Sequence, residues 1–243
     1  MENESISGIF LSGRDGWALV YITGDMHGDE ARFSAPELRK LKKGDTLLVC
    51  GDFGFLWEGT KAEKKTLDKL GKLKYSVGFI DGVHENFELL EQYPVVDWNG
   101  GRARQISGRL YHLLRGEIYT IEGKTFFAMG GGVSPDDDFR SLDDNRMRRE
   151  IPSREELDRA AANIAAAGGT VDYIVTHEPP MRIKSFLLLK DQARSPEITG
   201  LNTFFDEVGK ACTFKRWFFG SMHADKYIAT THVAVFRKVY KAE

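Results

Sequence analysis

The chain has 243 residues, a length that suits one large domain or two small ones. Hydrophobic residues make up 42% and charged residues 29%, which is typical of a globular protein with a sizeable core. Lys and Arg number 34 against 36 Asp and Glu, so the net charge of -2 gives no global attraction for nucleic acid. A nucleic-acid partner is therefore not expected.

The cysteines and the hydropathy pattern bear on location. Cys50 and Cys212 have no CxxC spacing, which argues against a disulfide scaffold or a thiolate zinc site and favours a reducing compartment. The N-terminal sequence MENESISGIF lacks the basic start of a signal peptide. No apolar run approaches the ~20 residues that a membrane helix needs. We expect a cytoplasmic protein that does not use a membrane.

The first half alternates predicted strands and helices, which indicates a parallel sheet. Capping boxes that begin at Ser34 and Thr60 mark the starts of two helices. In chain order we expect a strand at 17–24, a helix at 34–44, a strand at 46–50, a helix at 60–71, a strand at 76–80 and a helix at 84–92.

The second half adds antiparallel pairing. Glu122 and Gly123 form a predicted hairpin turn between strand-like runs, and Ser153 with Glu156 caps an Ala-rich helix. Further strands are expected at 110–114, 117–121, 124–130, 171–176 and 217–220, and within 227–240. We predict one α/β domain over 1–243, with an N-terminal extension at 1–16, a motif-bearing core at 17–226 and C-terminal strands at 227–243.

Asp and His residues follow the ends of predicted strands, where α/β sheets place their ligand sites. A single such residue is usually structural, but four of the six histidines share this position. A set of carboxylates and imidazoles suits Mn, Fe or Zn better than Ca or Mg. In chain order the residues are Asp25 and His27 in GDMHGD, Asp52 in GDFG, His84 in DGVHENF, His177 in THEPP and His223 in GSMH.

This ordered series resembles the DxH, GD, GN-H-E, H and GHxH motifs of calcineurin-like metallophosphoesterases, from about residue 21 to residue 226. The stretches RLYHLLRGEIYTIEGKTFFAMGGG, SPDDDFR and EIPSREEL are similar to a bacterial branch of that family. The resemblance implies a four-layer α/β/β/α sandwich of two mixed sheets flanked by helices. It also implies a metal-dependent phosphoester hydrolase, in which a metal-activated hydroxide attacks phosphorus in line.

The resemblance also assigns roles to residues. Asp25, His27 and His223 would hold the first metal. Asp52 would bridge two metals, and His177 would bind the second. His84 would be the catalytic histidine that stabilises or protonates the leaving group.

Two positions depart from the family pattern. Val83 stands where the family has Asn, and Ser221 stands where it has the first His of GHxH. Valine has no lone pair to donate, and serine is a weak neutral ligand. The second metal then keeps only Asp52 and His177, which is too few for the coordination these ions prefer. We therefore expect one intact metal site and one degenerate site.

Other features leave alternatives open. Arg140, in SPDDDFR, is the best candidate for substrate contact, since arginine forks match phosphate oxygens. His112 and His232 lie in predicted strands and are expected to be structural. The substrate would be a phosphorylated small molecule or another phosphoester, whether monoester, diester, nucleotide or phosphoprotein. A non-catalytic, single-metal module that binds a phospho-ligand or partner is the first alternative to a phosphatase, and a nuclease is the second.

Overall fold

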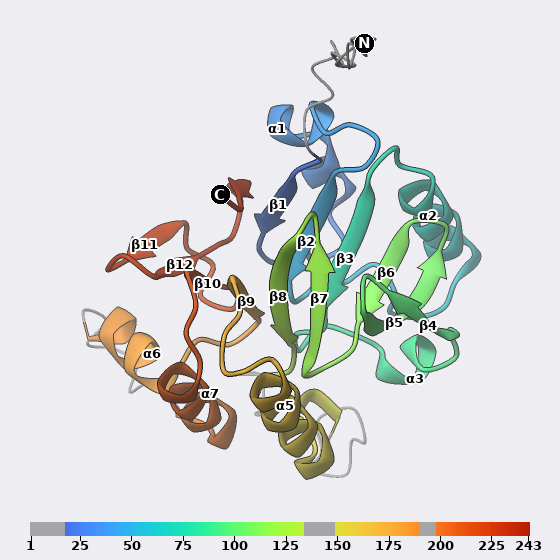
Figure 1. The fold of residues 1–243 in the computed structure, drawn as a ribbon. Coiled ribbons are helices and arrows are strands. Elements are labelled where there is room, and N and C mark those ends of the chain that lie inside the picture. The colour runs from blue at the N-terminus through green and yellow to red at the C-terminus, as the bar shows by residue number, and fades with distance from the viewer. Residues whose placement is uncertain (1–17, 134–148, 190–197) are drawn as a thin grey trace, which may run out of the picture.

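The computed structural model describes residues 18–133, 149–189 and 198–243. Two sheets pack face to face with helices on their outer faces (Figure 1). The strands are β1 (Val20–Thr23), β2 (Thr46–Cys50), β3 (Ser76–Ile80), β4 (Val95–Trp98), β5 (Gly101–Ser107), β6 (Leu110–Leu113), β7 (Glu117–Ile121), β8 (Lys124–Met129), β9 (Tyr173–Thr176), β10 (Arg216–Phe219), β11 (Lys226–Ile228), β12 (His232–Ala234) and β13 (Tyr240–Lys241). The helices are the 3₁₀ helix η1 (Glu30–Ser34), α1 (Pro36–Arg39), α2 (Lys61–Gly71), α3 (Phe87–Leu90), α5 (Arg154–Ala166), α6 (Met181–Leu188) and α7 (Gly200–Ala211).

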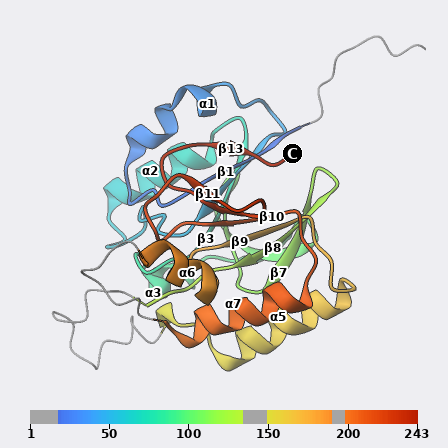
Figure 2. The same ribbon diagram turned by 90° about the vertical axis from the view of Figure 1, so that its left-hand side faces the viewer.

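Both sheets are mixed. The seven-stranded sheet has the order β13-β1-β2-β3-β6-β5-β4, and its central strands β1, β2, β3 and β6 are parallel. The six-stranded sheet has the order β11-β12-β10-β9-β8-β7, with β12, β10, β9 and β8 parallel. In Figure 2, α1 and α2 lie on one side of the sheets, and α5 and α7 lie on the other. The four-layer α/β/β/α sandwich is confirmed.

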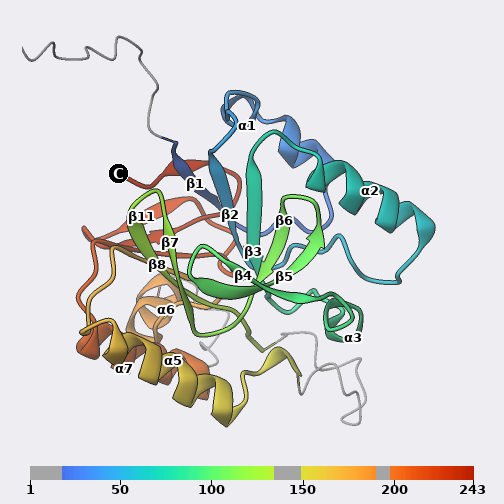
Figure 3. The ribbon, with the colours of Figure 1, turned by 45° about the vertical axis from the view of Figure 1, so that its right-hand side comes forward.

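Side-chain alternation along the strands divides the core into three layers. On β8, Phe126 and Ala128 face the other sheet, whereas Phe127 and Met129 face α5 and α7. Strands of both sheets are therefore buried on both faces, which explains their nearly continuous apolar sequences. The third layer lies between the seven-stranded sheet and α2, which runs along that sheet's outer face (Figure 3).

Most predicted elements are present, but two predicted helices are much too long. The helix expected at 34–44 is only α1, because Pro36 occupies its first turn and Ala35, which has no side-chain cap bond, precedes it. Ser34 instead ends η1. The helix expected at 84–92 is only α3, which Asn86 caps by accepting a hydrogen bond from the Leu89 N–H.

The structure adds β4, β5, α6 and α7, which the sequence analysis did not predict. β4 and β5 extend the edge of the seven-stranded sheet beyond β6. α6 and α7 contact each other and follow β9. Within 18–133, 149–189 and 198–243, no helix combines the length and the apolar composition needed to cross a membrane.

Candidate metal centre

Four of the predicted ligands converge at the carboxyl ends of strands from both sheets. Asp25 and His27 follow β1, Asp52 follows β2, and His223 follows β10. One donor atom from each lies within 4.8 Å of the other three. Residues nearly 200 positions apart in the chain therefore form one cluster because the two sheets pack face to face.

The backbone at this cluster is unusual. His27, Asp52 and His223 have φ angles of 50°, 44° and 45°, in the left-handed region that side-chain-bearing residues seldom adopt. They are three of the six non-glycine residues with positive φ in the described part of the chain. Such conformations persist where the surroundings impose them, and they concentrate at functional sites. The fold thus holds these side chains at the cost of local strain.

Glycines at the strand ends allow the carboxylates to be enclosed. A Cβ on Gly220 would lie 2.2 Å from Asp25 Oδ1, and a Cβ on Gly82 would lie 2.1 Å from Asp52 Oδ1. Any larger residue at either position would displace a carboxylate. The glycine that precedes each of these site loops is therefore part of the site.

The donor set fits a divalent transition metal. Both Asp25 side-chain oxygens are buried, and neither makes a hydrogen bond of acceptable geometry within the described residues, although His223 Nε2 lies 3.0 Å from Oδ2. His27 Nε2 and His223 Nε2 lie 3.0 Å apart, so their lone pairs point to a common region. Buried carboxylate oxygens without partners are costly unless they bind a cation. These residues therefore fit such an ion.

His177, the predicted ligand of the second metal, lies beside the cluster. Its ring is buried, with Nε2 3.6 Å from Asp52 Oδ1 and Nδ1 3.7 Å from Asp25 Oδ1. Nδ1 also lies 3.2 Å from the carbonyl oxygen of Cys50. A Cβ on Gly51 would lie 2.2 Å from Nδ1, so this glycine makes room for the ring.

His84, the predicted catalytic residue, also contacts the cluster. Its Nδ1 lies 2.7 Å from Asp52 Oδ2, and its backbone N–H donates to Asp52 Oδ1 over 3.0 Å. His84 was expected at the start of a helix, but α3 begins three residues later, at Phe87. The helix dipole is therefore not what controls its protonation.

Of the two departures from the resembled motifs, Val83 lies on the His177 side. Val83 donates its backbone N–H to Asp52 Oδ1 over 2.7 Å, but its side chain offers only carbon. A Cβ on Gly132 would lie 2.9 Å from Val83 Cγ1 and 3.3 Å from His177 Cδ2, so both side chains border the same spot. Ser221 Oγ is buried and has no hydrogen-bond partner within the described residues.

The acidic and basic segment that contains Arg140, the predicted substrate contact, lies outside the described residues. Of the predicted site residues, the structure brings together Asp25, His27, Asp52, His84, His177 and His223, with Val83 beside them and Ser221 two residues before His223 in the chain.

Comparison with protein families decides the ancestry. The model of one family, the calcineurin-like phosphoesterases, matches residues 18–224, which cover most of the chain and all of the cluster. The chain belongs to the calcineurin-like phosphoesterases. No curated protein matched the chain. The family acts on phosphoesters and generally uses divalent metals, and this member has an Asp/His group that can hold one.

The surroundings of two candidate metal ligands in this phosphoesterase shift their pKa values towards the ionised forms. Burial alone would raise the pKa of Asp52, but His177 and the hydrogen bond from His84 lower it below its ordinary value. Burial alone would lower the pKa of His177, but the carboxylates of Asp52 and Asp25 raise it to about 9. Asp52 is thus ionised at neutral pH, whereas His177 must release a proton to bind a metal. Metal affinity should therefore increase with pH.

Two residues at the site were not predicted. Arg32 Nη1 donates to the carbonyl oxygen of Asp25 over 2.6 Å and so fixes the loop after β1. Glu85 is buried, and its Oε1 accepts from the Phe53 N–H over 2.8 Å. Burial and the Asp52 charge raise the pKa of Glu85. The only sequence signal for Glu85 is its position directly after His84, in the motif GVHEN.

Proposed function

We propose that this chain hydrolyses phosphoesters with a divalent Mn, Fe or Zn ion held by Asp25, His27, Asp52 and His223. The supporting observation is the convergence of one donor atom from each of these residues within 4.8 Å, with both Asp25 oxygens buried and His223 as the nearest side chain to Oδ2, at 3.0 Å. The proposed substrate is a phosphorylated small molecule, and the proposed location is the cytoplasm, in keeping with two buried free cysteines.

Protein side chains would prepare the site for this reaction. A divalent metal bound there supplies Lewis-acid polarisation of a phosphoryl oxygen and activation of water. Asp25 and Asp52 provide negative charge to hold the cation, and the tight glycine contacts fix their orientation. His84 has a side chain that is 39% exposed, so its ring can reach a bound substrate while Asp52 orients it. We propose that His84 stabilises or protonates the leaving oxygen.

The proposal includes a weakened second metal position. Asp52 and His177 remain there, but Val83 and Ser221 supply no strong ligand. This observation also favours a second candidate function, a single-metal module that binds a phosphorylated ligand without turning it over. Both candidates require the first metal, and they differ only in turnover.

Metal content and turnover together test the proposal. The full chain is loaded with Mn or Zn, and bound metal is measured by elemental analysis beside hydrolysis of p-nitrophenyl phosphate and bis(p-nitrophenyl) phosphate. The Asp52→Asn variant is expected to lose the metal and the activity. Its matched control is Asp45→Asn, which changes a buried carboxylate that only accepts the Leu19 and Lys42 N–H groups.

The outcomes separate the candidates. Metal-dependent turnover that Asp52→Asn abolishes and Asp45→Asn leaves in place supports the hydrolase. Tight metal binding without turnover of either ester supports the binding module instead. A chain that retains no metal from either solution refutes both.

A further inference from the structure

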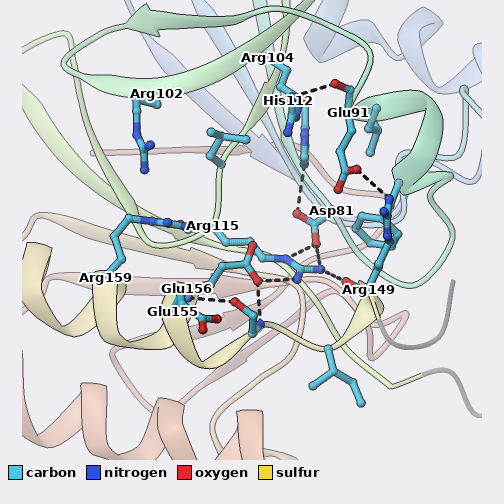
Figure 4. A pocket seen from close by; sticks show the side chains of 15 residues that line it. Asp81, Glu91, Arg102, Arg104, His112, Arg115, Arg149, Glu155, Glu156 and Arg159 are labelled. Carbon is cyan, nitrogen blue, oxygen red and sulfur yellow. Dashed lines mark hydrogen bonds and ion pairs between the residues drawn. The ribbon is translucent and has the colours of Figure 1, made fainter. Parts of the chain in front are cut away.

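Several arginines line a cavity of about 430 Å³ (Figure 4). It is lined from β5, β6, α3 and α5, and none of the candidate metal ligands lines it. Its volume is in the range of small-molecule pockets, about 300–1,000 Å³. The arginines among its lining residues are Arg102, Arg104, Arg115, Arg149 and Arg159.

Asp81, His112 and Arg115 form a buried polar network in this arginine pocket, which we call its floor. Asp81 is buried directly after β3, and its Oδ2 accepts from Arg115 Nε over 2.8 Å. Asp81 Oδ1 lies 3.1 Å from His112 Nε2. Arg115 also donates to Glu156 Oε2 and to the carbonyl oxygen of Glu150. The floor is therefore held rigidly by its own contacts.

Most carboxylates that line the arginine pocket are already engaged, and Glu155 is exposed to solvent. Glu91 accepts from Arg149 Nη1 over 2.8 Å, and Glu156 accepts from the Ser153 N–H over 2.8 Å as well as from Arg115. The pocket therefore does not present a free acidic surface to a cation.

Two polar atoms in the arginine pocket remain without partners among the described residues. One is Nδ1 of His112, a residue that is only 6% exposed. Nε2 donates to the Asp81 carboxylate, so Nδ1 is the ring nitrogen left for a ligand, and in the singly protonated tautomer it is an acceptor. The other is the buried Nε of Arg159, a donor whose nearest carboxylate oxygen, on Glu117, is 3.8 Å away. A ligand that satisfies both must offer an acceptor and a donor.

We propose that the arginine pocket binds a small organic anion, a phosphate ester or carboxylate that also carries a hydroxyl group. The anionic group would accept from Arg159 and from Arg102, whose side chain points into the cavity in Figure 4. Arg102 uses Nε and Nη2 to hold Glu117, which leaves Nη1 of its fork for the ligand. The ligand hydroxyl would donate to His112 Nδ1. Binding at this site does not require the metal.

Titration calorimetry on the full chain, after removal of metal with a chelator, tests this site. Chelation matters because a metal in the candidate centre would itself bind phosphate. The probes are methyl phosphate, whose dianion carries no hydroxyl group, and glucose 6-phosphate, which adds hydroxyls. Glucose 6-phosphate is expected to bind about 2–10-fold more tightly, the worth of one neutral hydrogen bond.

Variants assign the contacts. Arg159→Gln and Arg102→Gln should each weaken binding of both probes by about 10-fold or more, because each removes a charged donor. The matched control is Arg154→Gln on the same helix, an exposed arginine that pairs with Asp158 and should leave affinity unchanged. His112→Gln keeps a donor towards Asp81 but lacks Nδ1, so it should remove only the preference for glucose 6-phosphate.

Two results overturn the proposal. One is no binding of either probe at millimolar concentration to a folded, metal-free chain. The other is equal weakening by Arg154→Gln and Arg159→Gln, which would indicate general charge attraction. Thermal melting of each variant confirms that it is folded, and Arg102→Gln on β5 replaces Arg159→Gln if the latter unfolds. Since no turnover or metal is measured, this test stands apart from that of the hydrolase.

Discussion

Restoring Asn at position 83 and His at position 221 should rebuild the second metal position. Val83 borders the same spot as His177, around Gly132, so an amide oxygen at 83 would join the His177 ring. Ser221 Oγ is a buried oxygen without a hydrogen-bond partner in the described part of the chain, and it lies two residues before His223. With Asp52 and His177, the two new donors would give four protein ligands, the number at which zinc sites are normally complete.

The expected gain in turnover follows from the charge stabilisation that a single ion cannot provide. Two ions about 3.5–4 Å apart clamp both the attacking and the leaving oxygen, whereas one ion acts on only part of the charge. Removing one preorganised electrostatic element typically costs about 10²–10³ in rate. We therefore expect Val83→Asn with Ser221→His to raise turnover by about that factor and bound metal from one equivalent to two. Neither change alone completes the shell, so the effects should be strongly non-additive.

Without metal, the Val83→Asn substitution should lower the stability of the chain, although it is expected to raise turnover in the double variant with metal. Val83 is only 5% exposed, so an amide placed there lacks water as a partner. A buried polar group without a partner costs about 1–3 kcal/mol. For a chain of 243 residues, each kcal/mol corresponds to about 2–4 °C in Tm, so the metal-free Val83→Asn chain should melt about 2–12 °C lower. Added metal should reverse this loss only in the double variant.

A double-mutant cycle measures all three quantities: turnover of p-nitrophenyl phosphate, metal equivalents, and Tm with and without metal. The original chain and the two single variants are the controls. The reasoning is refuted if the double variant binds no more metal and turns over no faster than the original chain. Additive gains from the single variants would also count against it, because they would show that the two positions serve different ions.

Two further predictions concern a proton donor and a buried ion pair. His84→Ala should lower turnover of phenyl phosphate by about 10²–10⁴-fold and that of p-nitrophenyl phosphate much less, with metal content unchanged; equal losses on the two esters would exclude an acid role. Asp81→Asn should cost about 1.5–3 kcal/mol at neutral pH because the buried Arg115 loses one of its two carboxylate partners and keeps only Glu156. Burial alone would raise the pKa of Asp81, but Arg115 and His112 hold it below its ordinary value. The stability that the ionised Asp81 provides is therefore lost as the pH falls. Melting curves of the original chain and of Asp81→Asn should converge below pH ~4.

The sequence predicted correctly those helices and strands that short sequence patterns determine. The capping boxes at Thr60 and Ser153 both form, with side chain and backbone bonded in each direction. Strands β2 and β3 occupy the predicted residues because their apolar runs are buried on both faces. The prediction failed at Ser34, where a capping pattern precedes Pro36 and the proline sets the first turn of α1.

The site was predictable as a set of residues but not as a shape. Strand ends placed Asp25 and Asp52 on neighbouring strands, so their approach followed from the parallel order. The sequence did not predict the left-handed backbone at His27 and His223. It also did not predict the packing of the two sheets that brings these two histidines together. The arginine pocket was also missed, because Arg102 and Arg159 lie 57 positions apart and each looks like an ordinary surface residue.

The backbone beside positions 83 and 221 lies close to the candidate metal ligands. Gly82 and Gly220, which immediately precede Val83 and Ser221, approach Asp52 and Asp25 so closely that no side chain would fit in either place. The backbone N–H of residue 83 still donates to Asp52 whatever side chain stands there. We propose that a second ion position lacks only these two side chains, and for this reason two substitutions should suffice to restore it.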